Sequence, residues 1–287
     1  MQKNPLVSII INCYNGEKYL DEAIKSVLEQ NYKHWEIIFF DNNSTDKSSS
    51  ILKKYKDKRI KYFKSKKTYP LYKARNLAIA KSSGKLIAFL DVDDWWFRNK
   101  LNKQVKVFLK NNTIDVIYSN IYLYNEKNKT KEIYIKQKLN YGKLTQNLVD
   151  KFELPILSVL IKKKIFNQIK FDNRYTIIGD FDFFIRLSLI KNITPIQEPL
   201  ACYRIHDSNL TTKKIDLNIK ELENWVLDKT KKKNFKLINF SKVYILIKIL
   251  KTKKNILKGN KLESLAEILK YPFNILKLIF YKLIRKL

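Results

Sequence analysis

The sequence predicts an α/β protein with a Rossmann-like, mostly parallel central sheet covered by helices. Three observations support this prediction. Apolar runs without charge, such as 86–90, indicate strands that are buried on both faces. Segments with helical apolar spacing alternate with these runs along the first hundred residues. Polar clusters follow the strands at their carboxyl ends, where open α/β sheets bind ligands.

The elements follow one another in a regular order. We expect strands at 6–11, 35–40, 60–63, 86–90, 116–124, 133–135 and 159–161, with shorter strand pieces in 193–205. We expect helices at 19–30, 44–55, 71–80, 100–110, 144–152 and 163–169, and one that opens at Gly179. Ser44 or Asn43 can cap the second helix. Asp182 and Arg186, four residues apart, are predicted to pair on the surface of the last one.

Composition narrows the class of protein. At 287 residues and 45% apolar content the chain can build a substantial core. The five glycines are too far apart for a dinucleotide-binding or Walker-type loop. Cys13 and Cys202 show no paired spacing, so a reducing, cytoplasmic location is the simpler interpretation. Two histidines are too few for imidazole-rich metal sites, which leaves carboxylates to carry acid–base chemistry.

The net charge is +31, from 58 Lys and Arg against 27 Asp and Glu. Such a surface attracts polyanions in general, and a compositional bias spread over the whole surface explains it equally well. The start of the chain lacks a signal-peptide hydrophobic region, and we expect no membrane-spanning helix. Residues 273–287 are expected to form a basic amphipathic helix that would suit the inner face of an anionic cell membrane or, alternatively, would pack on the domain.

The acidic cluster at 91–94 is the strongest candidate site. Alternation along a strand would project Asp91 and Asp93 to one side, with Cα atoms about 7 Å apart. Two carboxylates at that separation can share one divalent cation. A solvated acidic turn that caps the next helix is the alternative. Tyr14-Asn15 and the 41–46 cluster follow two other predicted strands, so a parallel sheet would bring all three clusters to one crevice.

Five motifs in series carry a family resemblance: 8–15 (SIIINCYN), 41–46 (DNNSTD), 74–76 (ARN), 89–94 (FLDVDD) and 180–182 (DFD) with Arg186. Together they closely resemble the inverting family 2 nucleotide-sugar glycosyltransferases of the GT-A fold. The resemblance covers roughly residues 5–210. It implies a GT-A domain at 1–210, with a donor-binding half at 1–98 and an acceptor half at 99–210. Residues 211–287 would be a helical, basic C-terminal extension.

The resemblance also implies the donor contacts. Tyr14, with Asn15 beside it, would lie against a uracil ring, and Asp41 would accept the imide proton of that ring. Arg75 would contact the base or the phosphates, and Asp91 would face the ribose. The implied donor is a nucleotide sugar, most simply a UDP-sugar, and the implied acceptor is a glycan or lipid-linked hydroxyl in surface polysaccharide biosynthesis.

The remaining implied roles concern the metal and the chemistry. Asp93, with Asp91 beside it, would bind Mn²⁺ or Mg²⁺ on the diphosphate, and His206 would assist. Asp94 and Trp95 would orient the donor or the acceptor. Asp180 matches the catalytic base of the family, and a helix N-terminus is expected to favour its ionised form.

Each of these residues also has a structural interpretation. Tyr14 can be an ordinary half-buried aromatic side chain, Asp180 an N-cap, and His206 a structural histidine. The chain departs from the family at Asn12-Cys13, where Pro-Thr is usual, at Arg98, where proline is common, and at Gly179, where glutamate usually precedes the base. A non-catalytic sugar-nucleotide binder and a basic nucleic-acid-binding protein stay open as alternatives, although acids clustered at the cleft would repel a phosphate backbone.

Overall fold

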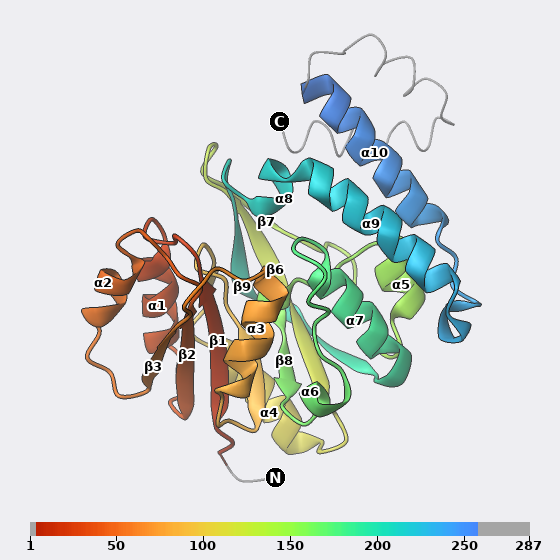
Figure 1. The fold of residues 1–287 in the computed structure, drawn as a ribbon. Coiled ribbons are helices and arrows are strands. Elements are labelled where there is room, and N and C mark those ends of the chain that lie inside the picture. The colour runs from red at the N-terminus through yellow and green to blue at the C-terminus, as the bar shows by residue number, and fades with distance from the viewer. Residues whose placement is uncertain (1–3, 258–287) are drawn as a thin grey trace. The chain divides into compact units, whose positions relative to one another are not determined.

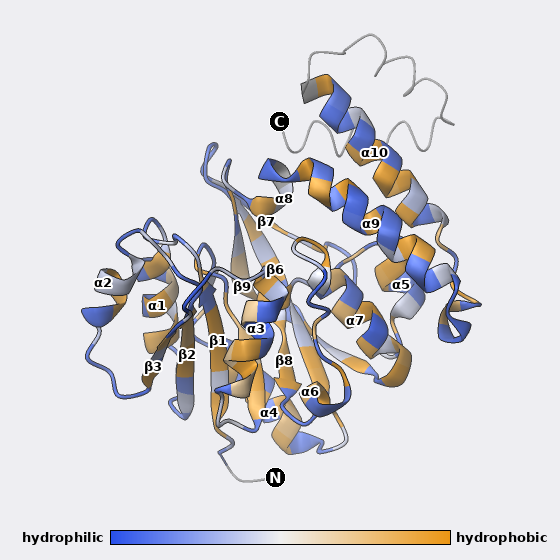
Figure 2. Ribbon diagram, viewed as in Figure 1, coloured by the Kyte–Doolittle hydropathy of each residue, from blue (hydrophilic) through white to orange (hydrophobic). Residues whose placement is uncertain are grey.

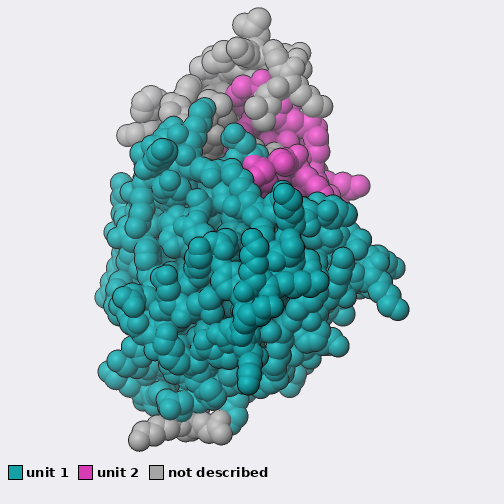
Figure 3. All heavy atoms as spheres, turned by 90° about the vertical axis from the view of Figure 1, so that its left-hand side faces the viewer, with its two compact units in different colours: residues 1–148, 152–207 teal, residues 149–151, 208–287 magenta. Residues whose placement is uncertain are grey.

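A computed structural model describes residues 4–257 of the chain. The described residues fall into two compact units, the first within 1–148 and 152–207 and the second within 149–151 and 208–287 (Figure 3).

Strands and helices alternate strictly over residues 7–89 of the first unit, and less regularly after them (Figure 1). The strands are β1 (Val7–Cys13), β2 (Trp35–Asp41), β3 (Ile60–Lys64), β4 (Leu86–Phe89), β5 (Trp95–Trp96), β6 (Val116–Asn125), β7 (Thr130–Ile133), β8 (Leu160–Lys162) and β9 (Ile193–Ile205). The helices up to residue 190 are α1 (Leu20–Leu28), α2 (Ser48–Lys53), α3 (Leu71–Ala80), α4 (Lys100–Lys110), α5 (Thr145–Asp150), the 3-10 turn η1 (Ile156–Ser158), α6 (Ile165–Gln168) and α7 (Gly179–Ile190).

Within the described residues the strands form one nine-stranded sheet in the order β3-β2-β1-β4-β8-β6-β9-β5, with β7 paired to β6. The strands β3, β2, β1 and β4 are mutually parallel. Strand β8 runs antiparallel to both β4 and β6, so β6 and its parallel neighbour β9 point the same way as β1. The carboxyl ends of β1, β2, β4 and β9 therefore lie along one edge of the sheet.

Apolar strands make the centre of this unit. Every residue of β1, β2 and β4 is buried, which is why these strands are nearly continuous apolar runs rather than alternating ones. Figure 2 shows this apolar character along β1 and β8. Amphipathic α1 buries Leu20, Ile24 and Val27 in the same core. Because the strands are packed on both faces, their positions are fixed, and so are the positions of the polar residues that follow the carboxyl ends of these strands.

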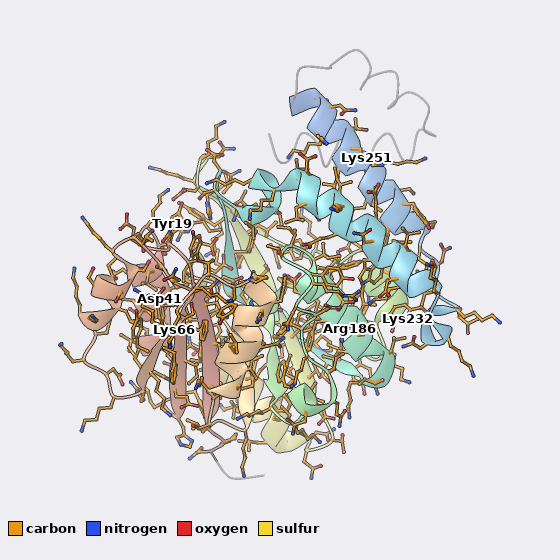
Figure 4. All side chains as sticks on the ribbon, viewed as in Figure 1. Tyr19, Asp41, Lys66, Arg186, Lys232 and Lys251 are labelled. Atoms are coloured by element: carbon orange, nitrogen blue, oxygen red, sulfur yellow. The ribbon has the colours of Figure 1, made fainter. Side chains whose placement is uncertain are left out.

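Three local expectations are wrong. Residues 193–205 form one strand, β9: Pro195 pairs in regular register with Tyr118 of β6, and shifts in the pairing on either side of Asn120 accommodate Pro199. Helix α2 begins only at Ser48, whose N–H donates to Asp46 Oδ1 at 3.0 Å. Arg186, labelled in Figure 4, does pair with Asp182 at 2.6 Å, but the Asp182 side chain is fully buried rather than on the surface.

The second unit is helical where it is described. It contains α8 (Leu210–Lys213), α9 (Ile215–Thr230), the 3-10 turn η2 (Lys233–Phe235) and α10 (Ser241–Leu257). Trp225 of α9 is buried and meets the rings of Phe235 and Phe240 edge-on, at 6.2 and 5.7 Å between centroids. No helix within residues 4–257 combines the length and apolar content needed to cross a membrane. The predicted amphipathic helix at 273–287 lies outside the described residues.

Candidate active site

The loops that follow β1, β2 and β4 lie against one another. Ser44 Oγ accepts a hydrogen bond from the backbone N–H of Asn15 at 3.1 Å, and Asn15 Oδ1 accepts one from the N–H of Thr45 at 2.9 Å. Gly16 approaches the loop after β4 so closely that a Cβ atom there would lie 2.8 Å from Cγ2 of Val92. The three polar clusters that follow these strands are therefore neighbours.

Asp41 ends β2 and is fully buried. Its Oδ1 accepts the N–H of Ser44 at 2.7 Å, and its Oδ2 accepts the hydroxyl of Tyr62 at 2.7 Å. The Tyr14 side chain is 55% exposed. Figure 4 labels Asp41 at this end of β2. Contact of either residue with a nucleotide base stays a prediction.

The acidic residues 91–94, called the acidic turn below, do not belong to a strand. Strand β4 ends at Phe89, and the N–H of Asp94 donates to the carbonyl oxygen of Asp91 at 3.2 Å, which closes a turn. The expectation that Asp91 and Asp93 project from one face of a strand is therefore wrong. A turn directs its carboxylates separately, and each meets a different partner.

Asp91 meets Arg75, which extends from the buried face of α3. The guanidinium Nη2 donates to Asp91 Oδ1 at 2.5 Å, and Arg75 is only 2% exposed. Burial disfavours the charged form, but the negative charges of Asp91 and Asp180 outweigh this effect and raise the pKa of Arg75. Arg75 is thus a permanent cation that links the acidic turn electrostatically to the first turn of α7.

Asp180 is the second residue of α7 and is half-buried. Its Oδ1 accepts the Tyr72 hydroxyl at 3.1 Å and the N–H of Phe181 at 2.8 Å. Burial raises the pKa of Asp180, and the charge of Arg75 together with the two hydrogen bonds opposes this without reversing it. The N–H of Phe181 at the helix N-terminus does favour the ionised form of Asp180, as expected, but burial outweighs it. A raised pKa makes Asp180 a stronger base than a surface aspartate.

Asp94 points away from solvent and is 1% exposed. Its Oδ1 accepts the N–H of Arg204 at 2.9 Å, which ties the acidic turn to β9. Burial, with the charges of Asp93 and Asp91, raises the pKa of Asp94 well above its usual range. Asp94 therefore anchors the acidic turn to β9 on its buried side. A direct role of Asp94 in orienting substrate stays a prediction.

Asp93 and His206 are brought together from positions 113 residues apart. His206 Nε2 lies 3.0 Å from Asp93 Oδ2, and the His206 ring packs at 4.9 Å from the ring of Tyr19. They meet because β5 pairs antiparallel with β9, with Trp95 opposite Cys202. This pairing folds the end of β9 back along the acidic turn.

The donor atoms here suit a divalent ion that the substrate helps to hold. Within the described residues no group of three or more His, Cys, Asp or Glu side chains is arranged to hold a metal ion. Asp93 offers carboxylate oxygen and His206 offers imidazole nitrogen, a mixture that Mn²⁺ accepts. Mg²⁺ and related ions in nucleotide sites usually take one or two carboxylates and complete their shell with phosphate oxygens. The residues therefore fit a metal site that a diphosphate completes.

Of the two tryptophans after the acidic turn, one is buried in the core and the other is partly exposed. Trp96 is buried, and its Nε1 donates to the carbonyl oxygen of Leu157 at 3.1 Å. Trp95 is half-buried and lies edge-on to Tyr124 at 5.5 Å between centroids. The Arg204 guanidinium stacks over the Trp95 ring at 4.7 Å. The Trp95 ring is thus held in place by Tyr124 and Arg204. Its role toward substrate stays a prediction.

Three residues of the site were not predicted. Tyr62 donates to Asp41, Tyr72 donates to Asp180, and Arg204 Nε donates to the Asp93 carbonyl oxygen at 2.9 Å. The Arg204 side chain also pairs with Glu22 of α1. A signal existed only for Arg204, which stands two residues before His206 in the sequence. The two tyrosines reach the site through tertiary packing and carry no local signature.

Comparison with known proteins places the chain in a family. The model of glycosyl transferase family 2 matches residues 8–186. The Escherichia coli UDP-Glc:alpha-D-GlcNAc-diphosphoundecaprenol beta-1,3-glucosyltransferase WfgD is 33% identical over 213 residues, which cover 73% of this chain and 81% of that protein. The E. coli protein WfaP, also a UDP-Glc:alpha-D-GlcNAc-diphosphoundecaprenol beta-1,3-glucosyltransferase, is 37% identical over 137 residues, which cover 48% of this chain and 54% of that protein.

Solved structures share the fold. TarS 1–349 of S. aureus in complex with UDP-GlcNAc superposes with a TM-score of 0.65 at 15% identity, covering 98% of this chain and 81% of that one. The mannosyltransferase PcManGT of Pyrobaculum calidifontis, with GDP-Man and Mn²⁺, gives a TM-score of 0.62 at 13% identity, covering 98% and 80%. The predicted GT-A fold class is confirmed. On its sequence match and its fold, the chain belongs to glycosyl transferase family 2.

Proposed function

We propose that this protein is an inverting glycosyltransferase that moves a sugar from a nucleoside diphosphate, most simply UDP, to a hydroxyl of a glycan or lipid-linked acceptor. Family membership supports the reaction class. The activity named for WfgD, with a UDP-glucose donor and a diphosphoundecaprenol-linked acceptor, supports the choice of both substrates. From the lipid-linked acceptor we infer a place in surface polysaccharide biosynthesis.

One observation carries the proposal. Buried Arg75 is paired with Asp91 of the acidic turn and lowers the pKa of Asp180 at the start of α7. A donor-side carboxylate and a candidate base are thus joined through one cation, although the residues are 89 positions apart. A nucleotide-sugar enzyme needs this juxtaposition, because the base must act at the anomeric carbon while the diphosphate is held beside it.

The reaction would be a single displacement. Asp180 removes the proton from the acceptor hydroxyl as the hydroxyl oxygen forms its bond to the anomeric carbon. The bond from that carbon to the diphosphate oxygen breaks with its electron pair, and the configuration inverts. General-base assistance of this kind contributes about 10²- to 10⁴-fold to the rate. The raised pKa of Asp180 suits that role.

The leaving group would be held at the acidic turn. Asp93 and His206 provide one carboxylate and one imidazole there, and Asp91 would face the ribose. A divalent ion bound at these residues supplies charge neutralisation for the departing diphosphate. Arg75 adds a fixed positive charge behind the turn.

The remaining residues are assigned to a donor-binding half and an acceptor half. In residues 1–98, which would bind the donor, Tyr14 would stack on the base, Asn15 would hold the loop that carries Tyr14, and Asp41 would accept the imide proton of the base. Residues 99–210 would receive the acceptor beside Trp95, and residues 211–287 would form a basic extension. Residues 273–287 lie outside the described structure, and peripheral contact with an anionic membrane is proposed from their sequence pattern alone.

The test uses UDP-glucose, UDP-GlcNAc and GDP-mannose, each with and without MnCl₂. A donor that binds should raise the thermal midpoint in proportion to ln(1 + [L]/Kd). With the donor that does so and a GlcNAc-diphospholipid acceptor, Asp180→Asn should lower transfer by at least about 10²-fold. The same variant should keep the donor-induced rise in midpoint, since Asp180 is not assigned to donor binding. Transfer at the wild-type rate would refute the base assignment.

Two other functions are separated by the same measurements. A non-catalytic binder would show the shift in midpoint with no turnover of any donor. A nucleic-acid-binding protein would show neither, but would bind DNA or RNA with a log–log salt slope of about −0.9 for each phosphate neutralised on duplex DNA.

A further inference from the structure

Gly179, directly before the proposed base, is held against an aromatic ring. A Cβ atom built on Gly179 would lie 2.2 Å from Cδ2 of Tyr72, 2.4 Å from its Cγ and 2.5 Å from its Cε2. No side chain fits in that space while the ring stays where it is. The glycine is therefore explained by close approach.

The Tyr72 ring has little freedom to retreat. It is 2% exposed, its centroid lies 5.5 Å from that of Phe171, and the Arg75 guanidinium covers it at 5.1 Å. Its hydroxyl donates toward two acceptors, the carbonyl oxygen of Ile177 and Asp180 Oδ1, each at 3.1 Å. The two acceptors lie on either side of Gly179 in the chain. The Tyr72 ring therefore lies against Gly179, and its hydroxyl is held by the residues around this glycine.

We propose that Tyr72 is a positioning residue for Asp180, and that Gly179 is its obligate partner because only glycine lets the ring reach the base. The inference rests on the proposed role of Asp180 as the base. It also explains why glycine stands at position 179, where the family usually has glutamate: the Tyr72 ring occupies the space that the Cβ atom of any other residue would need.

Several other groups act on Asp180, and the test must keep them constant. They come from α3, the acidic turn, the segment after β7, and β9: Arg75, Asp91, Tyr134 and Tyr203. Tyr72→Phe changes none of them. It keeps the ring against Gly179 and removes only the hydroxyl.

Tyr72→Phe should lower kcat about tenfold and leave the donor KM within about twofold, because a hydrogen bond to a charged group is lost on the acceptor side only. The acidic limb of kcat/KM should move up by about one pH unit, since the Tyr72 hydroxyl favours the ionised carboxylate. Tyr118→Phe is the matched control: Tyr118 is 3% exposed, and its hydroxyl donates to the Asn140 carbonyl oxygen at 2.8 Å.

A double-mutant cycle tests the pairing without any enzyme assay. Gly179→Ala should lower the thermal midpoint by more than about 4 °C in the wild-type background, where the Cβ meets the ring. In a Tyr72→Ala background the same change should cost less than about 1 °C or be stabilising, because alanine is normally favoured over glycine in a helix.

The outcomes are distinguishable. If Asp180→Asn keeps full activity, the proposed function fails at its base. If Asp180→Asn is inactive while Tyr72→Phe matches Tyr118→Phe in rate and pH profile, only the positioning role fails. Equal cost of Gly179→Ala in both backgrounds would overturn the pairing whether or not a substrate has been found.

Discussion

Replacing Arg75 by methionine removes a buried charge while keeping most of the apolar volume of the side chain. The guanidinium is paired with Asp91 at 2.5 Å, and the exposed fractions of the two side chains are 3% and 33%. Removing one partner of a fully buried ion pair costs about 3–5 kcal/mol. Because Asp91 is one-third exposed and water can replace part of the lost interaction, we expect a loss of about 2–3 kcal/mol.

The assay is thermal and urea unfolding of the whole chain. A loss of this size should lower the midpoint of a domain of about 200 residues by roughly 5–10 °C. Arg174→Met is the matched control, because Arg174 pairs with Asp172 at 2.7 Å while its own side chain is 63% exposed. We expect that change to cost less than about 1 kcal/mol.

Arg75→Met should also move the acidic limb of kcat/KM to higher pH. Arg75 lowers the pKa of Asp180, so its loss leaves only the smaller hydrogen-bond effects against burial. The carboxyl would then need a higher pH to ionise and act as a base. If Arg75→Met is as stable as Arg174→Met and its pH profile is unchanged, the linking role given to Arg75 is refuted.

Two further predictions concern the metal residues and a buried lysine. Asp93→Ala should abolish any strengthening of UDP-sugar binding by Mn²⁺, as measured by calorimetry. The control is Asp57→Ala, which breaks an ion pair with Arg59 at 2.6 Å and should leave the effect of Mn²⁺ intact. Equal Mn²⁺ dependence of binding in both variants would contradict the metal assignment. Lys100 is fully buried, and burial lowers its pKa well below 10.5, so the unfolded state binds more protons than the folded state below that pH. The unfolding free energy of the wild type relative to Lys100→Met should therefore rise as the pH increases toward about 10.5, and a flat difference would argue against a neutral Lys100.

The order of the elements was predictable because it depends on local pattern. Buried parallel strands require nearly uninterrupted apolar runs, and these stand out at 7–13, 35–41 and 86–89. Their parallel arrangement then placed the polar residues at one edge of the sheet. The family followed from the same positions, because its motifs occupy those strand ends.

The details of the acidic turn were not predictable by extending a strand. Strand alternation stops where the ladder stops, and β4 ends at Phe89. Asp94 then turns inward to the N–H of Arg204, and Asp91 turns to Arg75, and nothing in residues 91–94 themselves indicates these partners. Whether a carboxylate is buried or exposed depends on the segment packed over it.

The sequence by itself determined the α/β class, the family and the short stretches that supply the acidic residues, because each is written in neighbouring residues. Only the tertiary structure decided which partner each acid meets, that burial outweighs the groups that lower the pKa of Asp180, and that Tyr72 approaches Gly179. The physical reason is that burial, close approach and electrostatic coupling depend on contacts between segments about 100 residues apart in the sequence. A local sequence pattern does not predict such contacts.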